Sequence, residues 1–269
     1  MTGRLAIIAG RGGLPAALVA ALAERPLVAA LDGFLPEGLV PDQVFRIERL
    51  MAFLRSLERA GVSRLIFAGA VQRPRLDPAL FDPETAQMVP RLLTAMQGGD
   101  DATLREVIVI FEEAGFAVVG VADIAPDLLP GAGVLCGAPS AADARDAARA
   151  AKIVAALGAV DVGQGAVVAQ GLCLAVETLP GTDAMLDWVA QTAARPDPAG
   201  ARGVLFKAPK PGQDRRIDLP ALGVETLRRA AAAGLAGIAW QAGGVIILDP
   251  AAMVIEAQAR GLFLWARQP

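Results

Sequence analysis

Charged and amide side chains are concentrated between residues 204 and 226, in the segment VLFKAPKPGQDRRIDLPALGVET. Lysine presents a compact charge that suits a phosphate group, and an aspartate beside it can hold Mg²⁺ or orient water. The chain has only three lysines, and two of them lie in this segment. A site for chemistry on a phosphate is therefore one interpretation, and a solvated surface loop is the other. The polar residues concerned are Lys207, Lys210, Gln213, Asp214, Arg216 and Asp218.

The conformation of this segment follows from its prolines and glycines. A short apolar strand at 204–206 comes first, and Pro209, Pro211, Gly212 and Pro220 then exclude a continuous helix. We expect a fixed, irregular loop between this strand and a helix that begins near Val224. Binding and catalytic residues are concentrated on such loops.

The complete absence of histidine narrows the chemistry. It excludes Ser-His-Asp and Cys-His nucleophile systems, histidine bases and histidine metal ligands. The chain has no tyrosine either, so proton transfer must depend on Asp, Glu, Lys, Cys or a metal-bound water. Any metal site must use oxygen ligands, which favours Mg²⁺ or Mn²⁺ over Zn²⁺.

Composition sets the broad class of the protein. A chain of 269 residues, of which 54% are hydrophobic, can form one large or two small domains with a substantial core. The net charge of −3 argues against non-specific binding to nucleic acid. Cys136 and Cys173 stand in apolar surroundings and are expected to be core residues in a reducing compartment. No secretory signal is expected at the N-terminus.

Strands and helices alternate through the first half of the chain. Leu50, Phe53, Leu54 and Leu57 lie on one face of an amphipathic helix, and Asp100–Asp101 are expected to cap another. Such alternation predicts an α/β domain with a parallel, Rossmann-like sheet. The expected strands are 5–9, 27–31, 44–47, 64–71 and 116–122, and the expected helices are 14–24, 49–60 and the one that ends at Gly115.

The pattern changes after a Pro- and Gly-rich stretch at 129–140, which is interpreted as a linker. A C-terminal α+β domain is predicted beyond it, so that the domains are 1–133 and 134–269. Its expected elements are a helix at 141–157, a hairpin of 166–170 and 172–178, helices from Thr182 and Val224, a second hairpin at 236–248, a helix from Pro250 and a strand at 262–266.

The stretch from Ala230 to Leu248 carries no charge and has nearly the length of a membrane span. It is rich in alanine and glycine, however, and Gly243–Gly244 favour a turn between two strands. An apolar wall that binds acyl chains is the alternative interpretation of this stretch.

A glycine-rich loop, Gly10-Arg-Gly12-Gly13, follows the first strand and precedes a helix that begins at Leu14. Exposed N–H groups and the helix dipole can hold a phosphate at such a place. The dinucleotide fingerprint G-x-G-x-x-G requires glycine at position 15, where this chain has proline. Asp32 nevertheless stands where a ribose-binding acid would lie, so a nicotinamide enzyme is a weaker alternative. A tight turn that only packs helix on strand is the structural alternative.

Other polar groups stand at expected strand ends and helix starts. Gly69 and Arg73 follow a strand, at the edge where open α/β sheets bind ligands. Asp100 and Asp101 begin a helix, where one carboxylate can cap and the other can bind. The last group surrounds the predicted hairpin and the helix after it, where Thr182 could simply be an N-cap: Gln164, Gly165, Glu177, Gly181, Thr182 and Asp183.

Taken together and in order, these segments resemble one family, LpxI, the UDP-2,3-diacylglucosamine pyrophosphatases of lipid A synthesis. The resemblance covers nearly the whole chain, and its last two segments are long and specific. The matching segments are IAGRGGLP at 8–15, FAGAVQRP at 67–74, GDDATLR at 99–105, DVGQGAVV at 161–168, LAVETLPGTDAML at 174–186 and KAPKPGQDRRIDLPALGVET at 207–226.

The resemblance implies a Rossmann-like N-terminal domain and a distinct C-terminal domain with substrate held between them. It implies Mg²⁺-dependent hydrolysis to UMP and 2,3-diacylglucosamine 1-phosphate (lipid X), with water attacking the β-phosphorus. The essential family aspartate maps onto Asp218, the expected metal or water-orienting residue. Lys207, Lys210, Gln213 and Asp214 are the other expected catalytic residues. Expected to bind substrate are Gly10, Gly12, Gly13, Leu14, Gly69, Arg73, Asp100, Asp101, Gln164, Gly165, Glu177, Gly181, Thr182, Asp183, Arg216, Gly223 and Thr226.

A substrate with two acyl chains resides in a bilayer. The resemblance therefore implies a cytoplasmic protein of a Gram-negative bacterium that visits the inner membrane at its periphery, and a homodimer is the expected assembly. A non-catalytic carrier of acylated nucleotide sugars is the alternative function, because a binding protein could use the same lysines.

Overall fold

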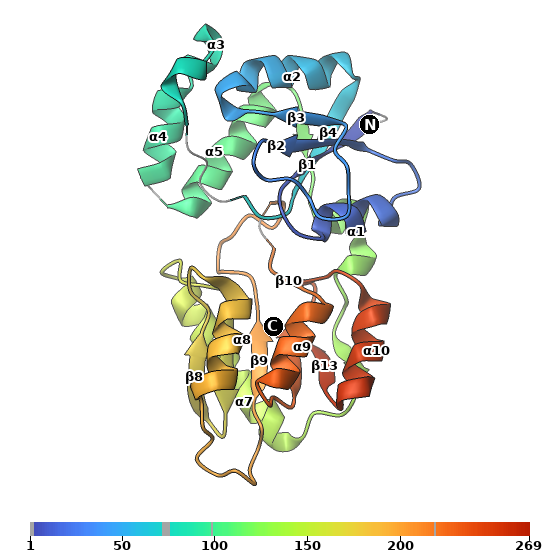
Figure 1. Cartoon of the computed structure of the whole chain (residues 1–269), viewed down its shortest axis with the longest axis vertical. Helices are drawn as coiled ribbons and strands as arrows, with labels where there is room; N and C mark the ends of the chain where they lie inside the picture. The colour runs from blue at the N-terminus through green and yellow to red at the C-terminus, as the bar shows by residue number, and fades with distance from the viewer. Residues whose placement is uncertain (1–2, 72–75, 98, 218) are drawn as a thin grey trace. The chain divides into compact units, whose positions relative to one another are not determined.

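The structure is a computed structural model that describes residues 3–71, 76–97, 99–217 and 219–269, except for the side chains of Asp100 and Asp101. The chain divides into two compact units, Met1–Ala125 and Pro126–Pro269 (Figure 1). Each unit has its own sheet.

The described part of the N-terminal unit contains a five-stranded sheet with the order β3-β2-β1-β4-β5, and each pair of neighbours is parallel. The two central strands β1 and β2 are almost wholly buried, as expected when helices cover both faces of a parallel sheet. The predicted Rossmann-like sheet is therefore confirmed. Its strands are β1 (Arg4–Ala9), β2 (Leu27–Leu31), β3 (Gln43–Phe45), β4 (Val62–Ala68) and β5 (Ala117–Val118).

An aromatic cluster joins this sheet to α2 (Leu50–Arg59) and α5 (Asp100–Glu113). Phe53 of α2 stacks on Phe45, and Phe111 of α5 packs edge-on against Phe53 and Phe67. The predicted apolar face of α2 is buried, which confirms it. The remaining elements are α1 (Leu14–Ala21), η1 (Ile47–Arg49), η2 (Pro78–Leu80), α3 (Pro83–Ala86), α4 (Val89–Gln97) and α6 (Val121–Ile124).

The start of α5 differs from the prediction. Gly99 is the N-cap residue, with φ +102°, and Asp100 and Asp101 form the first turn of the helix instead of capping it. Glycine adopts this positive φ at little cost, so Gly99 can take this conformation directly before the helix begins.

The C-terminal unit has a mixed six-stranded sheet in its described residues, with the order β6-β13-β11-β9-β7-β8. Its three central strands are parallel, and antiparallel strands flank them. These strands are β6 (Gly133–Cys136), β7 (Gly165–Ala169), β8 (Leu172–Val176), β9 (Val204–Lys207), β11 (Gly237–Gln241) and β13 (Phe263–Arg267).

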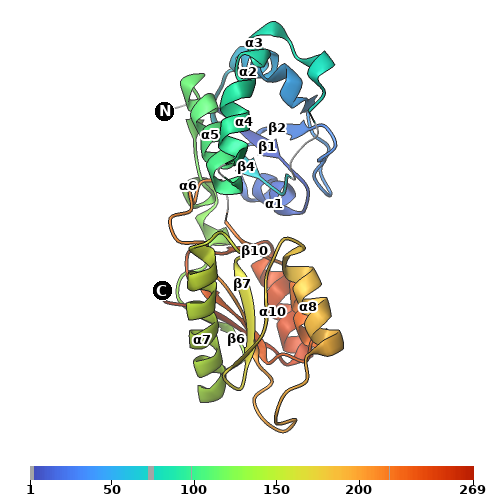
Figure 2. The same cartoon turned by 90° about the vertical axis from the view of Figure 1, so that its left-hand side faces the viewer.

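Helices cover both faces of this sheet. Figure 2 shows α7 (Ala141–Gly158) on one face and α8 (Gly181–Thr192) and α10 (Pro250–Arg260) on the other. The core on the second face also contains Leu227 and Ala230 of α9 (Val224–Ala232). The sheet has one core on each face, and the side chains of β9 alternate between them. Leu205 lies in the core with α9, and Val204 and Phe206 lie in the core on the α7 face.

Cys173, which was predicted to be a core residue, is exposed. Two predictions about the strands of this unit were also wrong. The predicted hairpin at 236–248 does not form, because β11 pairs in parallel with β9 and β13, while β12 (Ile246–Ile247) pairs in parallel with β10 (Ala221–Leu222). The predicted linker at 129–140 contains β6, which extends the sheet as an antiparallel edge strand. In both cases a partner distant in sequence decides the pairing.

The uncharged stretch at 230–248 lies mainly in the interior of this unit, with Leu235, Ile238, Trp240 and Ile247 fully buried. It therefore offers little surface for acyl chains, and the interpretation as an acyl-binding wall was wrong. Among the helices of the described residues, none has the length and apolar character that crossing a bilayer requires.

Candidate functional site

A buried lysine at the end of β9 anchors a small polar cluster, which we call the Lys207 cluster and which consists of Lys207, Thr182 and Glu177. The Lys207 side chain is 5% exposed. Its Nζ donates to Thr182 Oγ1 at 2.6 Å and lies 3.3 Å from Glu177 Oε2. Thr182 Oγ1 in turn donates to Glu177 Oε2 at 3.0 Å. The three side chains thus form a closed triangle of charge-assisted contacts, all from residues that the sequence predicted to bind or react.

Strand pairing places Glu177 beside Lys207. Gly165 at the start of β7 pairs with Lys207 in register, and the Gly165 carbonyl accepts from the Glu177 N–H at 2.8 Å. A Cβ on Gly165 would lie 2.6 Å from Glu177 Oε2, so a side chain there would displace the carboxylate. A buried lysine is costly without a paired acid, and this arrangement supplies one.

Thr182 does not cap α8. The N-cap position is occupied by Pro180, and no side chain of the N-cap residue contributes a hydrogen bond. The interpretation of Thr182 as an N-cap was therefore wrong, since its hydroxyl bridges Lys207 and Glu177 instead. Gly181, which has φ +88°, precedes it at the start of the helix.

The loop after β9 is held by Gln213. Its Oε1 accepts from the Lys210 N–H and from Gln164 Nε2, each at 2.9 Å. Lys210 Nζ donates to Asp161 Oδ1 at 2.5 Å. These contacts join the loop to the segment before β7. They bring together four polar residues, which are Asp161, Gln164, Lys210 and Gln213. Asp161 was missed as a site residue, although its position at the start of the DVGQG segment was a signal.

Asp214 and Arg216 form a pair within the same loop. The Asp214 carboxylate accepts from the backbone N–H of Arg216 at 3.0 Å and from Arg216 Nη2 at 2.7 Å. The Arg216 side chain is 39% exposed, so it lies at the surface of the loop while it is bound to the acid. Such a pair holds a cation in a defined orientation next to the Lys210 turn.

In the N-terminal unit, the loops after β1 and β4 are joined directly through backbone. The Arg11 N–H donates to the Ala70 carbonyl and the Ala70 N–H to the Arg11 carbonyl, both at 2.9 Å. A Cβ on Gly10 would lie 2.6 Å from the Ala70 oxygen, and one on Gly69 would lie 2.7 Å from the Arg11 oxygen. Glycine is therefore required at both places by close approach, and Gly69 also has φ +95°.

These joined loops lie at the topological switch point of the sheet, between β1 and β4 and at their carboxyl ends, where open α/β sheets bind ligands. Gly12, with φ +90°, leads into Gly13, the N-cap of α1, and Leu14 is the first residue of that helix. The sequence prediction that Gly10 and Gly69 belong to one site is consistent with this geometry.

Asp32, at the end of β2, accepts from Arg46 Nη1 at 2.9 Å. Arg46 also contacts Glu48, whose side chain is 4% exposed and accepts from the Asp77 N–H at 2.9 Å. Burial raises the pKa of the Glu48 carboxyl, but the hydrogen bonds from backbone N–H groups and Arg46 outweigh it and leave the pKa below its ordinary value. Asp32 therefore pairs with Arg46, whereas the nicotinamide alternative requires an acid at this position that binds a ribose hydroxyl.

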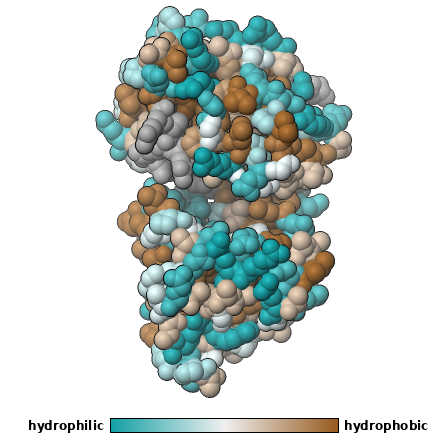
Figure 3. Space-filling view, in the orientation of Figure 1, coloured by the Kyte–Doolittle hydropathy of each residue, from teal (hydrophilic) through white to brown (hydrophobic). Residues whose placement is uncertain are grey.

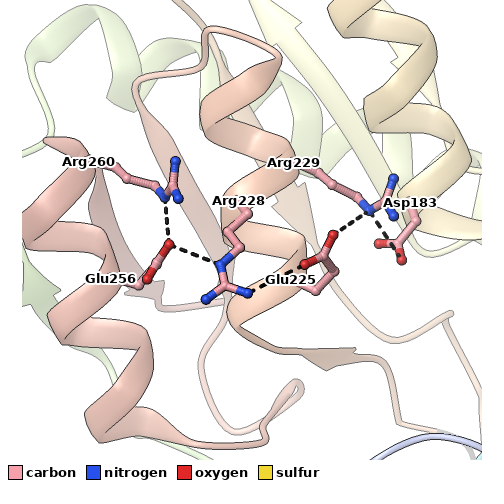
Figure 4. Close-up of polar contacts among 6 residues, drawn as sticks. All are labelled: Asp183, Glu225, Arg228, Arg229, Glu256 and Arg260. Atoms are coloured by element: carbon pink, nitrogen blue, oxygen red, sulfur yellow. Dashed lines mark hydrogen bonds and ion pairs between the residues drawn. The ribbon is translucent and has the colours of Figure 1, made fainter.

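The structure does not bring Asp183 into the Lys207 cluster. Its carboxylate lies 3.6 Å from Arg229 Nε, in a surface network of acids and arginines that joins α8, α9 and α10 (Figure 4). Hydrophilic side chains gather over these helices in Figure 3. Gly223 is the N-cap of α9 and Thr226 is half-buried in its first turn.

Four predicted site residues cannot be placed. Arg73 and Asp218 lie outside the described residues, as do the side chains of Asp100 and Asp101. Their proposed roles stay predictions.

The oxygen donors around the loop suit Mg²⁺ in kind, although within the described residues no three Asp, Glu or Cys side chains come together as a metal site. Mg²⁺ in proteins is commonly held by one or two carboxylates and by substrate phosphates, so three are not needed. Asp214, Asp161 and Glu177 each contact a cationic side chain. A metal held by any of these three acids would therefore have to share the acid with its cationic partner or replace that partner.

Comparison with known proteins covers both units. The family model of the LpxI N-terminal domain matches residues 4–128, and that of the LpxI C-terminal domain matches residues 131–265. The chain is also 37% identical, over 274 aligned positions, to the UDP-2,3-diacylglucosamine pyrophosphatase LpxI of Caulobacter vibrioides. That match covers 99% of this chain and 98% of the relative.

Proposed function

The chain belongs to the LpxI family, and on this premise we propose that it is a hydrolase of the pyrophosphate bond in UDP-2,3-diacylglucosamine, in lipid A biosynthesis. The products would be UMP and 2,3-diacylglucosamine 1-phosphate. The observation that carries the proposal is the full-length identity to a relative of that name, and the Lys207 cluster supports it as a site of phosphate chemistry.

The buried ammonium of Lys207 would neutralise charge that develops on the pyrophosphate. Its contact to Glu177, at 3.3 Å, is longer than its hydrogen bond to Thr182, at 2.6 Å, so Thr182 can hold the lysine while its charge faces a phosphate oxygen. Lys210 and Arg216 would supply further positive charge from the adjacent loop. Gln164 and Gln213 would fix that loop through their shared hydrogen bond.

We further propose that water attacks the β-phosphorus and that the bond from this phosphorus to the bridging oxygen breaks. The bridging oxygen would leave on UMP, while the new P–O bond would remain on the sugar phosphate. Asp218 would orient this water or hold Mg²⁺. When bound, Mg²⁺ would supply charge neutralisation and a lower pKa for a coordinated water.

The joined loops of the N-terminal unit would bind through backbone groups. The N–H groups of Gly12, Gly13 and Leu14 precede or begin α1, whose dipole favours an anion. This loop would therefore receive the nucleotide phosphate, with Gly69 kept small by its contact to Arg11.

The acyl chains of the proposed substrate also bear on location. We propose that the protein acts on the cytoplasmic face of the inner membrane as a peripheral visitor, and that it forms a homodimer. The proposal on location derives from the acyl chains of the substrate.

The test is Mg²⁺-dependent release of UMP from UDP-2,3-diacylglucosamine by the native protein and by Asp218→Ala. We expect the variant to lose several powers of ten in kcat while it still binds substrate, because it lacks a group that acts in the chemical step. Each tenfold loss in rate corresponds to about 1.4 kcal/mol of barrier. Near-native turnover in the variant would remove Asp218 from the chemistry. Tight binding without turnover by the native protein would favour the carrier alternative.

A further inference from the structure

A second cation, Arg267, stands at the same edge of the C-terminal sheet as Lys207. Arg267 is the last residue of β13 and pairs in register with Gln241, while Lys207 is the last residue of β9 and pairs with Trp240. The strands β9, β11 and β13 are parallel, so both cations follow the carboxyl ends of adjacent strands. Ligands of open α/β sheets bind beyond such ends.

The Arg267 side chain folds back over the face of the sheet, directly before this edge. Its Cζ lies 5.1 Å from the centroid of the Trp265 ring and 5.9 Å from that of the Phe206 ring. Trp265, Ala239 and Phe206 form one cross-strand row, and the small Ala239 stands between the two rings. The guanidinium therefore lies near Ala239 on the sheet face that packs against α7, whereas Lys207 lies on the opposite face, on the same side as Leu205.

The contacts of Arg267 leave its N–H groups available. In the part of the chain that the structure describes, the guanidinium has ring contacts but no hydrogen bond or ion pair to a carboxylate. Desolvation lowers the pKa of Arg267, yet arginine stays protonated in proteins. Stacking on aromatic faces fixes the plane of a guanidinium while its in-plane donors remain free for an anion. Arg216, Arg228, Arg229 and Arg260 of this unit differ, since each of them pairs with an acid.

We propose that Arg267 binds a phosphate group of the substrate, as a positioning residue at the carboxyl edge that no sequence motif identified. This inference rests on the proposed function for the identity of the substrate, and it adds a phosphate contact from β13 to those from the Lys207 loop. A planar guanidinium can give two parallel hydrogen bonds to a phosphate, which a lysine cannot. The Phe206 and Trp265 rings hold the guanidinium group in a fixed orientation before the ligand binds.

The experiment measures binding separately from turnover. Calorimetric titration with UDP and with uridine would compare the native protein, Arg267→Lys, Arg267→Met and the matched control Arg202→Met. Arg202 lies before β9 at the opposite edge of the sheet, is exposed, and donates only to the Gly261 carbonyl at 3.2 Å among the described contacts. Circular dichroism would verify that each variant is folded. If Arg267→Met does not fold, Arg267→Lys still tests the inference, because it keeps the positive charge and the aliphatic part of the side chain.

We expect the affinity for UDP to fall about tenfold in Arg267→Met and about threefold in Arg267→Lys, and to change less than twofold in Arg202→Met. Affinity for uridine should change little in any variant, because uridine carries no phosphate. Native UDP affinity in both folded Arg267 variants, or an equal loss for uridine, would overturn the inference. If the native protein binds UDP through Arg267 but hydrolyses no substrate, the inference stands and the proposed hydrolysis fails.

Discussion

The two units bring loops together at the carboxyl edges of parallel strands, but they use different chemistry there. In the N-terminal unit the contacts are made by backbone, with reciprocal hydrogen bonds between Arg11 and Ala70 and glycines where a Cβ would not fit. In the C-terminal unit they are made by side chains, with a buried lysine, a hydroxyl and a carboxylate in one cluster.

This difference indicates a division of labour. Backbone donors bind a phosphate without changing protonation, so the N-terminal edge is suited to recognition. Side chains with buried charge stabilise charge that develops during reaction, so the C-terminal edge is suited to catalysis. Substitutions at the first edge should therefore affect KM or folding, whereas those at the second should affect kcat.

The largest effect is expected at Lys207. Lys207→Met should lower kcat by about 100- to 1,000-fold, equivalent to roughly 3–4 kcal/mol of barrier, because it removes the buried charge that we propose to neutralise the phosphate. Steady-state kinetics would measure it, and circular dichroism would verify folding. Lys152→Met is the matched control, since Lys152 is the remaining lysine and is exposed on α7. Unchanged kcat in Lys207→Met would contradict the assignment of catalysis to the C-terminal edge.

Gly69→Ala tests the backbone-built edge. We expect it to lower the free energy of unfolding by about 2–4 kcal/mol, from a positive φ and a Cβ that overlaps the Arg11 carbonyl. Urea unfolding would measure the loss. Gly38→Ala is the control, because Gly38 also has a positive φ but open space around its Cβ position. Equal losses in the two variants would show that close approach to Arg11 contributes nothing.

A smaller effect is expected at Thr182. Thr182→Val removes the hydroxyl between Lys207 and Glu177 while keeping its volume, and should cost about 1–3 kcal/mol of stability and about tenfold in kcat. Thr182→Ser keeps the hydroxyl and should retain most of both. Urea unfolding and kinetics on the pair would measure this. If serine behaved like valine, the methyl group rather than the hydroxyl would be the important part.

The smallest effect concerns Asp82, which caps α3 in the N-terminal unit and belongs to neither edge. The Thr85 N–H donates to its carboxylate at 2.8 Å and holds the pKa of Asp82 below its ordinary value. Because the folded pKa is the lower one, this stabilisation is fully present above the unfolded pKa of about 3.9 and is lost as the pH falls through the folded pKa.

Asp82→Ala should therefore cost about 1 kcal/mol at pH 7 and less near pH 3, as measured by urea unfolding at the two pH values. Asp82→Asn keeps an uncharged cap, so its stability should depend less on pH. Turnover should be native in both variants. A change in kcat would mean that the catalytic edge is not confined to the C-terminal unit.

Local pattern predicted much of the fold. Alternating apolar strands and amphipathic helices gave the parallel sheet of the N-terminal unit, and the buried face of α2 follows from the spacing of Leu50, Phe53, Leu54 and Leu57. Strand pairing in the C-terminal unit was less predictable. The β11 strand reads equally well as half of a hairpin, and only its parallel partners β9 and β13 exclude that arrangement.

The sequence likewise predicted some of the residues in the candidate site, but it did not predict how they contact one another. Residue type singled out Lys207, because a lysine-poor chain without histidine leaves few groups for phosphate chemistry. Glu177 and Thr182 were predicted from the segment that resembles the family. The sequence did not show that Thr182 bridges the other two instead of capping α8, nor that Asp161 pairs with Lys210. The Thr182–Lys207 and Asp161–Lys210 contacts join residues 25 and 49 positions apart, so a local pattern does not show these pairings.

The resemblance of the ordered motifs to the LpxI family indicated the family and the class of chemistry. The parallel sheet was predicted from the alternation of strands and helices, because that alternation depends on periodicities of a few residues. Tertiary structure alone decided which charges are buried together and which glycines are required by contact. It also decided that the Arg267 guanidinium lies near the Phe206 ring. The physical reason is that burial and pairing depend on distances between strands distant in the chain, which are fixed only when the sheet has formed.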